Sequence, residues 1–199
     1  MAIFKKYYSR QGLWTLFLIC ALPLHLWALF LSLRDFDWIT ARTNSWDAVG
    51  VVSYGLLFAF LESLAIFALA ALLGFLISNK WIENKRVALM GTFVIVLSFW
   101  SILNQTYFLR AVTPSGQILS LFAGTGRPLI ALYITALFLI GLTVILPTYF
   151  ILRSEKVEKI VLDGFERFSL LMTLYLFFDF IALVIVLVRN FEVHYESLN

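Results

Sequence analysis

Three ionisable residues, His25, Glu62 and Asp179, lie inside long apolar stretches of the sequence. Asp179 is the only acidic residue in LYLFFDFIALVIVLVRN, residues 174–190. A charged side chain at the centre of a bilayer costs about 3 kcal/mol or more, so such groups normally face neighbouring helices and find partners there. Two carboxyls and an imidazole can relay protons, bind a cation or hold helices together through hydrogen bonds.

Helical spacing indicates where these three groups find polar neighbours. Tyr175 precedes Asp179 by one helical turn, and His25 and Glu62 lie on stripes of small residues that permit close helix packing. The third apolar stretch carries a polar stripe of its own. We therefore predict a polar layer at mid-membrane, in which at least one carboxyl keeps its proton because burial and mutual repulsion disfavour two negative charges. The predicted layer consists of His25, Glu62, Asp179, Tyr175, Ser98, Ser101 and Gln105.

Five apolar stretches supply the helices that position this layer. A hydrocarbon core of about 30 Å requires about 20 apolar residues in a helix. The stretches cover residues 13–33, 48–77, 87–109, 129–152 and 169–188. Hydrophobic residues make up 62% of the chain and charged residues only 14%, which is unlike a soluble domain. We predict an all-α, polytopic integral membrane protein with five transmembrane helices, in which residues 1–199 form a single membrane domain.

The basic residues predict the orientation of these helices. About two thirds of the 15 Lys and Arg residues lie at the N-terminus or in the second and fourth connectors, which are on the same side of the predicted membrane. Connectors rich in Lys and Arg stay in the cytoplasm. We therefore predict a cytoplasmic N-terminus, an extracytoplasmic C-terminus and a location in the cytoplasmic (plasma) membrane.

The fourth connector, residues 153–168, has the pattern of an amphipathic helix. Val157, Ile160, Val161 and Phe165 share one face, and charged residues share the other. Such a segment typically lies along the membrane interface. We predict an interfacial helix that joins the fourth and fifth spans, with docking of a cytoplasmic partner as the alternative.

Two pairs of charged residues lie in the predicted outer connectors. Asp35 and Asp37 form a D-x-D pair after the first span, and in membrane glycosyltransferases such a pair can bind a divalent metal or deprotonate an acceptor. The simpler interpretation is a solvated loop in which nearby arginines offset the acids. Arg110 and Arg127 bracket the third connector and are candidate contacts for anionic lipid head groups or a partner protein.

The residues needed by most enzyme and cofactor classes are missing from the sequence. G-x-S-x-G, H-E-x-x-H, C-x-x-C and P-loop motifs are absent, and Cys20 is the only cysteine. His25 and His194 fall in different compartments of the predicted topology, which argues against bis-histidine haem ligation. The basic residues form no separate patch for nucleic acid. We predict no catalytic residue, no metal and no cofactor.

The layout resembles the five-helix membrane domain of the lipoteichoic acid synthase and phosphoethanolamine transferase type of sulfatase-fold enzymes. FFDFIALVIVLVRN and NQTYFLRAVTPSGQILSLF are similar in character to segments of those proteins. The resemblance implies a membrane platform whose soluble catalytic domain is encoded separately or missing, because the chain ends at Asn199, where that domain would begin. It carries over no catalytic residue.

Three functions remain compatible with these patterns. We favour a non-catalytic subunit or scaffold of a larger membrane complex, which would bind membrane lipids and other membrane protein subunits. The first alternative is a small proton- or cation-coupled carrier that uses Glu62, Asp179 and His25. The second alternative is an accessory protein for lipid or glycan handling at the outer face.

Overall fold

The computed structural model describes residues 7–77, 81–106 and 116–196, and side chains as far as Phe191. The long helices are α2 (Arg10–Thr40), α3 (Ser45–Leu76), α4 (Glu83–Asn104), α6 (Pro128–Arg153) and α7 (Glu155–Glu196). Two short helical segments, α5 (Gly116–Ser120) and η2 (Ala123–Thr125), precede α6. Within the described residues, five helices are long and apolar enough to cross a membrane. The predicted all-α fold class with five such helices is therefore confirmed.

The helix boundaries differ from the predicted spans in two places. α2 continues to Thr40, so Asp35 and Asp37 lie on a helix instead of in a loop. The predicted connector, residues 153–168, and the fifth span form one continuous helix of 42 residues. Ser154 alone separates α6 from α7, and its hydroxyl accepts a hydrogen bond from the Val157 amide at 3.4 Å, which caps the start of α7. No proline interrupts the sequence after this cap, so the helix has no local reason to end before its apolar half.

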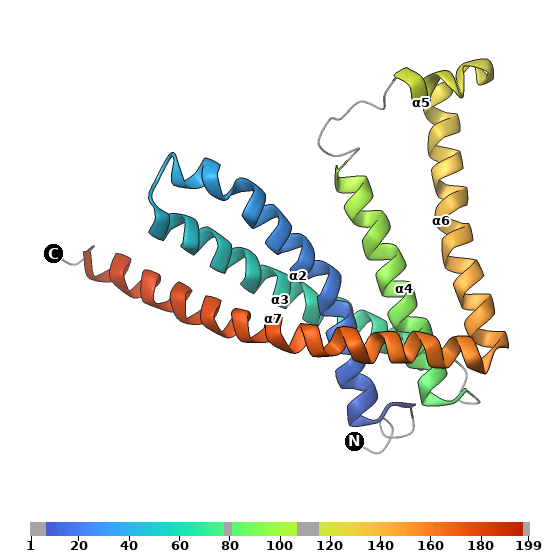
Figure 1. Cartoon of the computed structure of the whole chain (residues 1–199), viewed down its shortest axis with the longest axis horizontal. Coiled ribbons are helices and arrows are strands. Elements are labelled where there is room, and N and C mark those ends of the chain that lie inside the picture. The colour runs from blue at the N-terminus through green and yellow to red at the C-terminus, as the bar shows by residue number, and fades with distance from the viewer. Residues whose placement is uncertain (1–6, 78–80, 107–115, 197–199) are drawn as a thin grey trace.

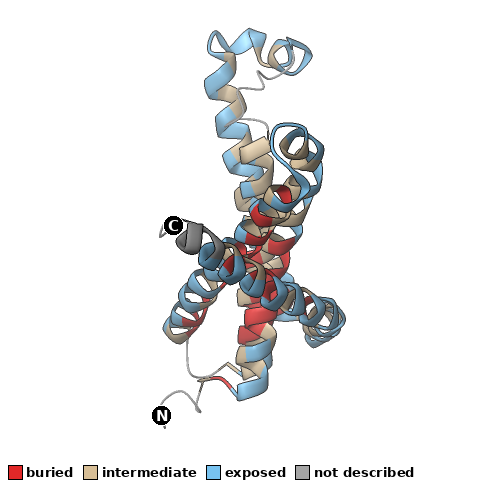
Figure 2. Cartoon of the chain, turned by 90° about the vertical axis from the view of Figure 1, so that its left-hand side faces the viewer, coloured by how far each residue is buried: buried red, intermediate tan, exposed pale blue. Residues whose placement is uncertain are grey.

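The helices form two groups that diverge from a common base (Figure 1). α2 and α3 lie side by side with the C-terminal half of α7, whereas α4 and α6 stand together and the N-terminal half of α7 crosses near their lower ends. α2 contacts α3, α4 and α7, so it is the central helix. Figure 2 shows that the buried residues gather where the groups meet, and Ile151 is the one buried residue of α6.

Small residues allow the close helix contacts at the base. A Cβ atom added to Gly91 of α4 would lie 2.8 Å from Cζ of Phe165 and closer still to a neighbouring ring carbon. Phe165 of α7 is itself buried, and real Cβ atoms essentially never approach another atom this closely. Gly91 therefore fixes how near α7 can come to α4.

We expect Gly91→Ala to destabilise the protein by about 1–3 kcal/mol, because the added methyl group overpacks the contact with Phe165. The free energy of unfolding, measured by titration with sodium dodecyl sulfate in mixed micelles, checks this. Gly141→Ala on α6 is the matched control, since an added Cβ there meets nothing within 4 Å. A Gly91→Ala protein as stable as the Gly141→Ala protein would contradict the prediction.

The residues just before α2 are anchored to the start of α4. Ser9 caps α2 by accepting a hydrogen bond from the Gly12 amide, and its own amide and hydroxyl donate to Oε1 of Glu83 at 2.7 and 2.6 Å. The guanidinium of Arg86 is fully buried and donates to the Tyr7 carbonyl oxygen at 2.6 Å. The Arg86 Cζ also lies 4.9 Å from the ring centre of Tyr7 and 5.6 Å from that of Tyr8. These contacts join α2 and α4 at the base.

Burial raises the pKa of Tyr8 to about 12, and the positive charge of Arg86 opposes that rise in part. The phenol keeps its proton at ordinary pH, and it packs against Gly74 of α3, where a larger residue would clash with it. The sequence alone gave Arg86 no role beyond one positive charge in a connector.

Candidate functional site

His25 and Asp179 form a buried pair between α2 and α7. The His25 side chain is fully buried, and only 7% of the Asp179 side chain is exposed. His25 Nε2 lies 2.9 Å from Oδ2 of Asp179, and Nδ1 lies 2.8 Å from the carbonyl oxygen of Ala21. Met172 of α7 and Ala21 of α2 are completely buried nearby in the same α2–α7 contact. The predicted meeting of two ionisable residues from separate helices is therefore present for His25 and Asp179.

The contacts of His25 determine how many protons the pair holds. A carbonyl oxygen can only accept, so Nδ1 must carry a proton that it donates to Ala21. One further proton must lie between Nε2 and Oδ2, because an imidazole lone pair facing a carboxylate would repel it. With that proton on either partner, the pair carries no net charge. The low-polarity surroundings thus favour a neutral, hydrogen-bonded unit.

Tyr175 also lies near this pair, but its contact is through the ring. The ring centres of Tyr175 and His25 are 6.4 Å apart, with 33° between the ring planes. The other oxygen of Asp179, Oδ1, is buried without a hydrogen-bond partner in the described part of the chain. Of the two Asp179 oxygens, Oδ2 is therefore hydrogen-bonded to His25, whereas Oδ1 has no hydrogen-bond partner among the described residues.

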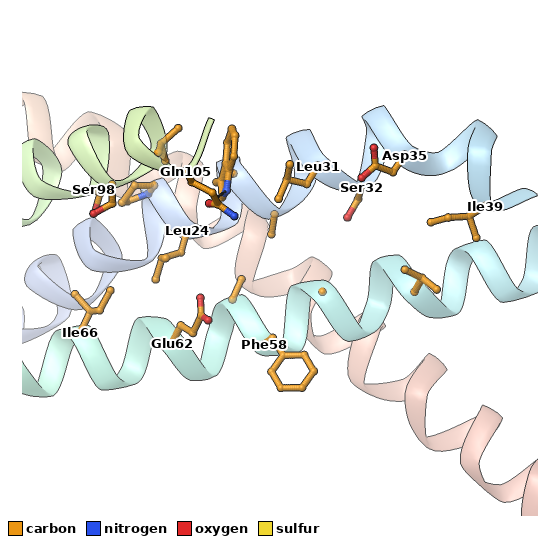
Figure 3. Close-up of a pocket in the computed structure, with 18 residues that line it drawn as sticks. Leu24, Leu31, Ser32, Asp35, Ile39, Phe58, Glu62, Ile66, Ser98 and Gln105 are labelled. Carbon is orange, nitrogen blue, oxygen red and sulfur yellow. Dashed lines mark hydrogen bonds between the residues drawn. The ribbon is translucent and has the colours of Figure 1, made fainter. Parts of the chain in front are cut away.

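Glu62 belongs to a separate site, the α2–α3–α4 pocket, which has a volume of about 500 Å³. Figure 3 shows the Glu62 carboxylate pointing from α3 toward α2, with Gln105 of α4 across the pocket. The remaining predicted residues of the third span, Ser98 and Ser101, line the same pocket. The structure thus places the residues of the predicted layer in two groups, a His25–Asp179 pair and a pocket around Glu62.

The faces of α2 explain this division. One face of α2 lines the pocket, and its residues follow the i, i+3, i+4, i+7 spacing of a helix face. These residues are Leu24, Trp27, Ala28 and Leu31. His25 is offset from that face and points to α7. The direction in which a residue points from its helix therefore decides which neighbours it meets.

Two acidic side chains line the pocket, and only one of them has a partner in the described part of the chain. Asp35 is held by Arg34, whose Nε and NH2 donate to Oδ1 and Oδ2 at 2.6 Å each. Within the described residues, Glu62 has no hydrogen-bond or ion-pair partner, although hydroxyl groups of α2 and α4 line the same pocket. Trp27, which the sequence did not single out, donates from Nε1 to Oε1 of Gln105 at 2.7 Å.

The other predicted contact residues lie apart from this pocket. Asp37 is exposed, and it points away from Asp35 because residues two positions apart face different directions on a helix. Arg127 is exposed at the start of α6, and Arg110 lies outside the described residues. In the described part of the chain, no group of three or more His, Cys, Asp or Glu side chains could hold a metal ion.

The fold and these two sites define an all-α protein with five helices apolar enough to span a membrane, a neutral His–Asp pair and an acidic pocket. No protein-family model matches the chain, and no curated protein or solved structure is significantly similar to it. The resemblance to the membrane domain of the lipoteichoic acid synthase type therefore stays a prediction.

Proposed function

We propose that the chain is a non-catalytic integral membrane subunit or scaffold of a larger membrane complex in the cytoplasmic membrane, with its N-terminus in the cytoplasm. The observation that carries the proposal is the exposed apolar surface of α6. This helix is long and apolar enough to cross a membrane, yet only Ile151 at its end is buried. Its main contacts are with α4, α7 and the short segments α5 and η2.

A helix that touches so little of its own chain is suited to packing against another chain. Association of helices in a membrane depends on close van der Waals packing, which small residues promote. Ile134, Phe138, Gly141 and Ile145 fall on one stripe of α6, and nothing in the described chain lies within 4 Å of the position of a Gly141 Cβ. This stripe, the α6 outer stripe, is the surface that we assign to a partner helix.

The test is purification of the tagged chain in a mild detergent, followed by quantitative mass spectrometry. We expect another membrane chain to co-purify in a fixed ratio, and Gly141→Leu to reduce its recovery at least fivefold because the larger side chain blocks the α6 outer stripe. Leu170→Ala, which changes an exposed apolar residue of α7 away from this stripe, is the control. A monodisperse chain without a membrane partner would contradict the proposal.

A proton- or cation-coupled carrier is the second candidate, and the unpartnered Glu62 favours it. The pocket follows α2 from Pro23 to Ile39, which in the proposed orientation extends from mid-membrane to the outer end. The His25–Asp179 pair, in contrast, carries no net charge, so Glu62 would serve as the coupling group. Proteoliposomes test this: proton-coupled cation flux that Glu62→Gln abolishes would support a carrier, and equal flux in both proteins would exclude this mechanism.

A further inference from the structure

We propose that the α2–α3–α4 pocket binds a monovalent lipophilic organic cation, with the Glu62 carboxylate as its counter-ion. This inference concerns binding alone, so it goes beyond the subunit role and requires no transport. If the chain is a carrier, the inference names the class of its substrate.

The charged side chains around the pocket favour binding of a cation over binding of an anion. Among the described residues, its lining includes Asp35 and Glu62 but no Lys, Arg or His side chain. Arg34 donates a hydrogen bond to each oxygen of Asp35, so Glu62 is the carboxylate that remains available to a ligand. A carboxylate within the most apolar part of a membrane helix is stable only when it takes a proton or faces an opposite charge. The pocket thus presents one negative charge that the described chain does not neutralise.

The side chains that line the pocket favour binding of an organic ion over binding of a metal ion. Hard cations such as Mg²⁺ and Ca²⁺ require about six or more oxygen ligands, and one free carboxylate with a few hydroxyls is a poor set. Apolar side chains form most of the lining, including Phe58 and Ile66 of α3 and Leu31 of α2 (Figure 3). A volume of 500 Å³ falls within the range of small-molecule sites, about 300–1,000 Å³.

Trp27 adds an aromatic wall that is held in place. Its Nε1 donates to Gln105, and its ring stacks on Phe30 with centres 5.4 Å apart and 17° between the planes. Tryptophan is the aromatic residue that attracts organic cations most strongly through its ring face. A ring fixed by two contacts loses little freedom when a ligand binds, which favours affinity.

Tetraphenylphosphonium is the probe, because it is a monovalent lipophilic cation, and tetraphenylborate provides an anion of the same shape. Binding of each to the purified full chain in a mild detergent is measured by equilibrium dialysis with labelled probe. We expect saturable, one-to-one binding of tetraphenylphosphonium and no saturable binding of tetraphenylborate. Equal saturable binding of both ions would overturn the proposal, because the site would then recognise shape and apolar surface alone.

Two variants locate the site. Glu62→Gln is expected to weaken tetraphenylphosphonium binding at least tenfold, while Glu62→Asp retains most of it. Ala28→Leu fills the pocket without changing its charge and is expected to weaken binding to a similar degree. Glu166→Gln, on an exposed position of α7, is the matched control. Binding that survives both Glu62→Gln and Ala28→Leu in proteins that elute as the wild type does would overturn the assignment.

The pH dependence gives an independent readout. A proton and the cation compete for the Glu62 carboxylate, so binding should weaken at acidic pH, and this dependence should vanish in Glu62→Gln. The charged groups facing the pocket from the surrounding helices are Asp35 with its partner Arg34 on α2 and Glu62 on α3, while α4 contributes Ser98, Ser101 and Gln105. Asp35→Asn should leave the pH profile in place. A profile that follows Asp35 instead of Glu62 would contradict the proposal.

Discussion

Replacing His25 with leucine is expected to lower the free energy of unfolding by about 3–5 kcal/mol, which is the usual cost of breaking a buried pair by removing one partner. Leucine fills a similar volume, so the loss comes mainly from the Asp179 carboxyl, which remains buried without its only hydrogen-bond partner in the described chain. Unfolding with sodium dodecyl sulfate in mixed micelles, followed by far-ultraviolet circular dichroism, measures the change.

Two further variants separate the lost pairing from altered packing. Asp179→Asn should cost less than His25→Leu, because the asparagine amide can donate to Nε2 while Nδ1 still donates to Ala21. The double variant His25→Leu with Asp179→Leu should recover much of the loss, since apolar replacement of both partners is often nearly neutral. If the double variant is less stable than His25→Leu alone, the shared-proton description of the pair is wrong.

Replacing Arg86 with alanine is the second large effect, with an expected loss of about 3 kcal/mol from a charged hydrogen bond and a cation–π contact. The change removes the donor to the Tyr7 carbonyl and the cation beside the rings of Tyr7 and Tyr8. It also leaves a cavity, because the Arg86 side chain is fully buried. The same unfolding titration measures the loss, and trypsin cleavage after Arg10 should become faster as the base loosens.

The controls for Arg86 distinguish its geometry from its charge. Arg86→Lys keeps the charge but lacks the planar group that can bond a carbonyl and lie against an aromatic ring, so it should remain well below the wild type in stability. Arg167→Ala removes an exposed cation from α7 and should change stability by less than about 0.5 kcal/mol. Equal stability of the Arg86→Ala and Arg167→Ala proteins would show that the base does not depend on this anchor.

Local properties of the sequence were sufficient to predict the five apolar helices. Hydropathy and length are set within each segment, so they require no knowledge of neighbours. His25 and Asp179 were both assigned to the predicted polar layer, and the structure brings the two side chains together. Which polar residue faces which helix depends on rotation about each helix axis, and the spacing of small residues did not specify that rotation for Glu62.

Long-range packing accounts for the features that the sequence did not reveal. Arg86 was counted among the basic residues that set orientation, yet its burial arises from Tyr7 and Tyr8, which are nearly eighty positions away. The end of the predicted connector was placed at residue 168 because the hydrophobic pattern changes there. A change in the hydrophobic pattern changes the surroundings of a helix but does not end the helix. α7 therefore continues past residue 168 without a break.

Because α7 is unbroken, it acts as one rigid helix. At 1.5 Å per residue its 42 residues extend about 63 Å, which is about twice the thickness of a hydrocarbon core. Phe165 meets Gly91 near the base, and Asp179 meets His25 about 21 Å further along the same axis. A rotation or slide of α7 therefore cannot alter one contact and spare the other, so α2 and α4 are mechanically linked through a helix that neither adjoins in sequence.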